Sequence, residues 1–118
     1  LAASFKGWAY CRDNQKACVD IVLKNGTLLG RGHQTWQMNE INKLIWPAPV
    51  RGVGVMNPIA YARTAAISKQ FKVITKTPSG AYRTDLAKAA NATLRKQGVN
   101  TTGLTWKAVV VKVTPGGK

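Results

Sequence analysis

The sequence predicts a mainly α-helical protein of about five helices that ends in one β-strand. Apolar residues recur at intervals of three and four over most of the chain, which is typical of amphipathic helices. Asn, Gly and Pro stand where these intervals break, as they do at helix ends. The C-terminal part changes to alternating β-branched residues. The chain has 118 residues, of which 45% are hydrophobic, so we expect a single helix-rich domain over residues 1–118.

The first two helices are expected over residues 1–12 and 15–24. Phe5 and Trp8 repeat at helical spacing in the first segment. Asn25-Gly26 follows the second segment and is a common C-terminal stop. The intervening RDNQKA contains Asp and Asn, which favour helix starts, so we expect the chain to turn a corner there.

Cys11 and Cys18 flank this corner. On one continuous helix they would lie about 10 Å apart along the axis, beyond the reach of a disulfide. A break between two helices could bring the sulfurs together, and a bridge would indicate an oxidising compartment. The alternative is two small buried thiols, and the sequence leaves both interpretations open.

The third helix is expected over residues 33–45. Its predicted buried stripe consists of Met38, Ile41, Leu44 and Ile45. Trp46-Pro47 should end the helix, because a residue before proline is forced out of the helical region.

The fourth and fifth helices are expected over residues 58–71 and 82–97. Asn57-Pro58 combines a favoured N-cap with proline at the first helical position. Gly98 should stop the last helix.

The segment TWKAVVVKV, residues 105–113, is the predicted strand. A lone strand has no ladder partner. We therefore expect it to pair with polypeptide outside this sequence or to drive self-association. Leu1 stands inside the first predicted helix, which also favours a segment of a longer chain.

The chain is strongly basic, with 18 Lys and Arg against 4 Asp and Glu and a net charge of +14. Such a surplus attracts anions. The basic residues are scattered, and no zinc-finger spacing or RNA-binding aromatic motif accompanies them. The charge therefore favours non-specific binding to a polyanion or an anionic surface, such as nucleic acid, lipid or cell wall, as an alternative function.

No catalytic constellation stands out. The acidic residues Asp13, Asp20, Glu40 and Asp85 are dispersed rather than paired for acid–base chemistry. His33, the only histidine, has no neighbouring nucleophile or second ligand type. We therefore expect no enzyme activity, no metal site and no cofactor.

Trp36 and Glu40 lie four residues apart on the third predicted helix, beside its buried stripe. They could face a cleft, with the indole stacking on a ligand and the carboxylate accepting a hydrogen bond. Alternatively, Trp36 packs on a neighbouring helix and Glu40 pairs with Lys43. Arg51 and Tyr82 are further candidates, so the predicted ligand-binding residues are Trp36, Glu40, Arg51 and Tyr82.

Four extended strings carry a family resemblance: FKGWAYCRDNQKACVDIVLKNG, HQTWQMNEINKLIWP, GVGVMNPIAYARTA and AYRTDLAKAA. In this order they resemble segments near the C-terminal end of periplasmic substrate-binding proteins of ABC importers. The closest likeness is to the group that binds nitrate, sulfonates, taurine and pyrimidine precursors. The resemblance covers residues from about 4 to 98.

The resemblance implies a type II binding-protein architecture, in which two α/β lobes close around a solute. It also implies a small organic or anionic solute, an ABC permease as partner, and a periplasmic or secreted location. The two lobes need more polypeptide than this sequence contains. The resemblance therefore implies that the chain is the C-terminal part of such a protein.

Overall fold

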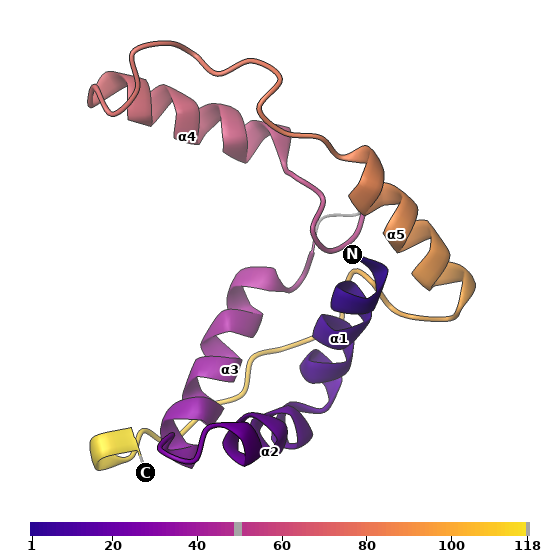
Figure 1. Cartoon of the computed structure of the whole chain (residues 1–118), viewed down its shortest axis with the longest axis vertical. Helices are drawn as coiled ribbons and strands as arrows, with labels where there is room; N and C mark the ends of the chain where they lie inside the picture. The colour runs from indigo at the N-terminus through magenta and orange to yellow at the C-terminus, as the bar shows by residue number, and fades with distance from the viewer. Residues whose placement is uncertain (49–50, 118) are drawn as a thin grey trace.

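The computed structural model describes residues 1–48 and 51–117, and its described part is helical (Figure 1). A 3-10 turn, η1, closes the described chain at Pro115–Gly117. The five helices are α1 (Ala2–Asp13), α2 (Gln15–Asn25), α3 (Arg31–Ile45), α4 (Pro58–Gln70) and α5 (Asp85–Lys96). All five predicted helices are thus confirmed, with ends that differ by a few residues.

The corner between α1 and α2 is closed by a disulfide. α1 ends at Asp13 and α2 starts at Gln15, so the chain breaks where two helices were expected to meet. The break brings the Cα atoms of Cys11 and Cys18 to 5.5 Å, and the two sulfurs are bonded. The disulfide is therefore the correct interpretation of this cysteine pair.

The core lies where α1, α5 and the loop after α3 meet. Phe5 of α1 and Leu94 of α5 pack there with Trp46, Val53 and Val55 from the loop. α1 also packs against α2, and α2 packs against α3. We call α1, α2, α3 and α5 together the helical base.

The buried face of α3 is partly polar, which corrects the predicted stripe. Asn39 and Asn42 are the fully buried residues of this helix, whereas Leu44 is 87% exposed. Asn42 accepts a hydrogen bond from the indole Nε1 of Trp46 at 3.2 Å. Asn39 binds the main chain of Val109. Both side chains are buried because they make specific hydrogen bonds. The spacing of hydrophobic residues in the sequence gives no sign of such buried polar groups.

The α4 arm, which comprises α4 and the loop of residues 71–83, projects away from the helical base (Figure 1). The side chain of Asn57 caps α4 by accepting from the backbone N–H groups of Ile59 and Ala60 at 3.0 and 3.2 Å. No residue of α4 is buried. The arm is therefore held by its own helical hydrogen bonds and cap rather than by packing.

The predicted strand at residues 105–113 is wrong. In the described part of the chain this segment passes α3 without regular secondary structure, and no sheet forms (Figure 1). The reason is the absence of a second strand, since β-structure needs a ladder partner. A side chain supplies the contact instead. Asn39 Nδ2 donates to the Val109 carbonyl at 3.0 Å, and the Val109 N–H donates to Asn39 Oδ1 at 3.1 Å.

The chain is more open than a compact domain of its size. Its radius of gyration is 17.2 Å, against about 13–14 Å for a compact domain of this length. Its accessible surface is 8524 Å², against about 6,300 Å² for a compact monomer of the same mass. The excess exposed area is comparable to the total area that two proteins bury in an ordinary interface. Among the described residues, none of the helices has the length and apolar character to cross a membrane.

Candidate functional site

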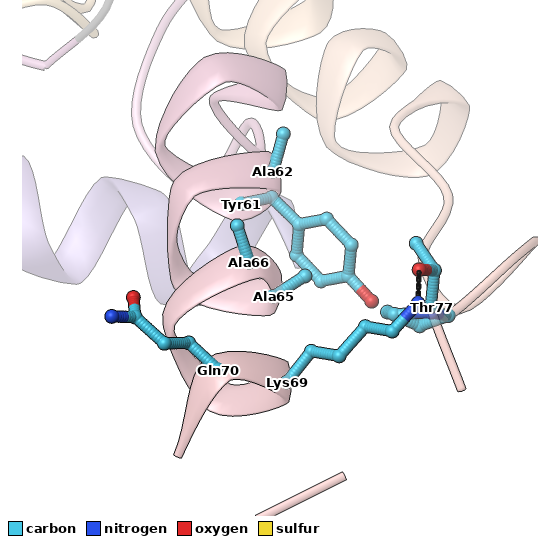
Figure 2. Close-up of a pocket in the computed structure, with 8 residues that line it drawn as sticks. Tyr61, Ala62, Ala65, Ala66, Lys69, Gln70 and Thr77 are labelled. Carbon is cyan, nitrogen blue, oxygen red and sulfur yellow. Dashed lines mark hydrogen bonds between the residues drawn. The ribbon is translucent and has the colours of Figure 1, made fainter. Parts of the chain in front are cut away.

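A hollow with a volume of about 510 Å³ lies on the α4 arm (Figure 2). Its floor is made by the methyl groups of Ala62, Ala65 and Ala66. Tyr61 and Lys69 of α4 stand beside this floor, and Thr77 faces them from the returning loop. We call this hollow the α4 pocket.

Helical spacing explains how one helix presents these groups together. Tyr61, Ala65 and Lys69 stand four residues apart, which places them on one face of α4. The small side chains of Ala62, Ala65 and Ala66 leave room for the hollow, because larger side chains at these positions would fill it. The turn after α4 then brings the loop back, with the N–H of Val73 donating to the Ser68 carbonyl at 2.8 Å.

Two contacts involve residues that line the α4 pocket. The Lys69 ammonium donates to the Thr77 hydroxyl at 3.4 Å, a long hydrogen bond between helix and loop. The ring of Tyr61 meets the ring of Tyr82 edge to face, with centroids 4.7 Å apart and planes at 60°. The pocket thus combines an apolar floor, an aromatic wall and one ammonium group.

The electrostatics of the pocket favour an anion. Lys69 forms no ion pair with an acidic side chain in the described part of the structure. A negatively charged ligand could therefore accept from it without displacing a carboxylate. The volume lies within the range of about 300–1,000 Å³ that small-molecule sites occupy. Chemically, the arrangement fits a small organic molecule with one anionic group.

The structure places the four predicted ligand residues on different elements. Tyr82 lies next to the α4 pocket through its contact with Tyr61. Trp36 and Glu40 are one turn apart on α3, and the main chain of Arg51 accepts a hydrogen bond from Arg95 of α5 at 2.8 Å. These contacts do not gather the four residues into one site within the described structure.

Trp36 lines a second, smaller hollow at the start of α3, of about 290 Å³. Its ring lies 5.8 Å from that of His33, and Val113 and Gly117 face the pair from the C-terminal segment. The described residues that line this hollow include no lysine or arginine. This hollow is therefore the poorer match to an anionic ligand.

Glu40 is engaged within its own helix. It accepts from Lys43 Nζ at 2.6 Å and from Asn39 Nδ2 at 3.3 Å. The pairing with Lys43 is the simpler of the two arrangements that the sequence allowed.

Tyr61 and Lys69 are the residues that sequence reasoning missed. They belong to a helix with weak amphipathic character, and such a helix gives no strong indication of which face matters. The available signal was the spacing of eight residues between an aromatic and a cationic side chain across an alanine-rich stretch. Nothing in the sequence indicates that the loop of residues 71–83 returns to this face.

Two exposed carboxylates have lowered pKa values because of their cationic neighbours. Hydrogen bonds from Arg83 are the main reason that the pKa of Asp85 falls from 3.8 to about 2. Hydrogen bonds from Arg31 and then Lys16 lower the pKa of Asp20. Within residues 1–48 and 51–117, no three His, Cys, Asp or Glu side chains come together as metal ligands.

We found no match to this chain among known protein families, curated proteins or solved structures.

Proposed function

We propose that this chain is the solute-binding component, or a part of it, of an ABC importer and that the α4 pocket contributes to its site for a small organic anion. The observation that carries this proposal is the group formed by Tyr61, Lys69 and Thr77 around an alanine floor, with Tyr82 packed against the ring of Tyr61. The strings GVGVMNPIAYARTA and AYRTDLAKAA, which resemble such binding proteins, contain both tyrosines.

The open form of the pocket fits a protein that closes around its solute. α4 buries none of its residues, so further polypeptide has room to cover the pocket from outside. Closure over a bound solute would exclude water and strengthen the attraction between Lys69 and the anion. Greater affinity of the closed form would then drive the change in shape. The Cys11–Cys18 disulfide is compatible with a periplasmic or extracellular location.

The test is calorimetric titration of the protein with pairs of solutes that differ in one charge, such as benzoate and benzamide. We expect the anion to bind more tightly than the amide. Lys69→Met should weaken binding of the anion about tenfold, the value of one charge-assisted hydrogen bond, and should leave binding of the amide unchanged. Tyr61→Leu should weaken both.

Lys88→Met is the matched control, because Lys88 is an exposed lysine on α5, outside the pocket. This variant should bind both solutes like the unaltered protein. Equal affinity of Lys69→Met for the anion, or the absence of saturable binding by any of the solutes, would contradict the proposal.

A second candidate function rests on the charge. The ion pairs of the described structure use Arg12, Lys16, Arg31, Lys43 and Arg83, and only 4 acidic residues are present for 18 basic ones. Most basic side chains are thus available to a polyanion. If this is the function, the affinity for heparin or DNA falls steeply as salt rises, with a log–log slope of several units. A flat salt dependence would exclude it.

A further inference from the structure

The segment of residues 107–113 runs beside α3, and one buried side chain attaches it to the helix. Asn39 is 1% exposed, and its amide both donates to and accepts from the main chain of Val109. This is the pattern by which a neighbouring strand binds one residue of an extended chain. The buried amide therefore fixes the direction of the peptide groups at Val109.

Fixing Val109 also fixes its neighbours. In an extended chain the N–H and C=O of successive residues point to opposite sides. Those of Val109 point to α3, so an extended backbone at this point turns those of Ala108 and Val110 away from the helix. Val110 is 100% exposed. Within the described structure, these outward groups of Ala108, Val110 and Lys112 have no hydrogen-bond partner.

We propose that this outward edge, residues 107–113, binds an extended segment of an acidic polypeptide through main-chain hydrogen bonds. Addition of an extended peptide to such an edge is a common mode of recognition, in which the main chain gives affinity. The exposed side chains of Val109, Val110 and Val113 suit an extended partner.

Charge determines the kind of partner. Lys107 and Lys112 stand at the two ends of the edge, and the whole chain carries +14. A second copy would bring the same surplus to the interface, and its approach would be opposed by long-range repulsion. The negative charges of an acidic segment would be attracted to both lysines.

The probe is a short synthetic peptide in which glutamate alternates with valine, carrying a fluorophore for anisotropy. Its control is the same peptide with N-methyl groups on every second amide, which removes the donors of one edge but keeps the composition. We expect the unmodified peptide to bind and the methylated peptide to bind at least about tenfold more weakly. Binding should weaken as salt rises.

A pair of proline variants tests the edge on the protein. Val110→Pro removes an N–H that points outward, whereas Val111→Pro removes one that points toward α3. We expect Val110→Pro to weaken peptide binding about tenfold and Val111→Pro to leave it nearly unchanged. Both substitutions lie outside the core cluster, so equal thermal unfolding midpoints check that the fold is intact.

Several results would overturn the inference. These are equal binding of the two peptides, equal loss in both proline variants, no binding of the acidic peptide, and equal binding of a lysine-containing peptide. Sedimentation is the remaining check, because dimers that Val110→Pro abolishes would assign the edge to a second copy instead. The solute titrations of Lys69→Met do not involve this edge, so the two proposals can fail separately.

Discussion

α1 and α4 have nearly the same length, 12 and 13 residues, but opposite relations to the rest of the molecule. α1 buries Phe5, Ala9 and Arg12, and a disulfide ties it to α2. α4 buries none of its residues, and the Asn57 side chain caps its first turn. The comparison teaches that helical sequence alone does not determine which helix supports the core and which presents a surface.

Arg12 shows how α1 is secured. It is 5% exposed and its guanidinium lies 4.6 Å above the centre of the Trp46 ring. It also donates to the Asn100 carbonyl at 2.8 Å and to Asp13. One side chain thereby joins α1, the loop after α3 and the segment after α5. No residue of α4 makes a comparable connection in the described structure.

Replacing Arg12 should have the largest effect on the base. Arg12→Met keeps much of the side-chain volume but removes the ring contact and the hydrogen bond to Asn100. We expect a loss of about 3 kcal/mol in the free energy of unfolding, within the range for breaking a buried charged network. Urea unfolding followed by circular dichroism measures it. Arg63→Met on α4 is the control and should change stability by less than about 0.5 kcal/mol.

Two glycines with positive φ extend the comparison to the loops. Gly54 has φ +76° beside the base, and an added Cβ would lie 2.2 Å from Phe5 Cζ. Gly80 has φ +61° on the α4 arm, where an added Cβ meets nothing within 4 Å. Gly54→Ala should lose about 2–3 kcal/mol, from strain and displacement of Phe5.

Gly80→Ala should lose only about 1 kcal/mol, the cost of the left-handed backbone for alanine. Thermal unfolding of both variants separates the two contributions, since they share the backbone strain and differ in the contact. Equal losses would mean that the close approach to Phe5 has no effect on stability.

Asn57→Ala should loosen α4 without unfolding the base. The cap is worth about 1 kcal/mol, because two backbone N–H groups lose their acceptor. Since α4 buries no residue, this loss should appear as about fivefold faster hydrogen exchange in the first turn of α4. The free energy of global unfolding should stay the same. A lower stability of the whole chain would show that α4 is coupled to the core.

The helices could be predicted because their ends depend on local chemistry. Asn57 as an N-cap and Gly26 after α2 act on the backbone next to them. The buried polar groups could not be predicted. Asn39, for example, is buried where it binds the main chain of Val109, which lies 70 residues further along the chain. The predicted strand failed for the same reason, because pairing depends on a partner segment rather than on β-propensity.

The candidate site divides in the same way. Tyr82 could be selected as an aromatic residue in a polar setting, and it packs against Tyr61, which lines the α4 pocket. Lys69 and Thr77 meet only because the loop after α4 turns back. Turns that bring distant side chains together are fixed by the whole fold, so this part of the site required the structure.

The smallest predicted effect concerns the start of α5, which carries an acidic residue in its first turn, whereas α4 has none there. Hydrogen bonds from Arg83 lower the pKa of Asp85 from 3.8 to about 2, so the folded state favours the charged carboxylate. The stabilisation is present above pH 4 and is lost as the pH falls through 2.

Asp85→Asn should remove this acid-dependent part and flatten the curve of thermal midpoint against pH between 4 and 2. Because both side chains are exposed, the change should be small. An unchanged slope in Asp85→Asn would assign the acid sensitivity to Asp20, whose pKa is lowered mainly by hydrogen bonds from Arg31 and then Lys16.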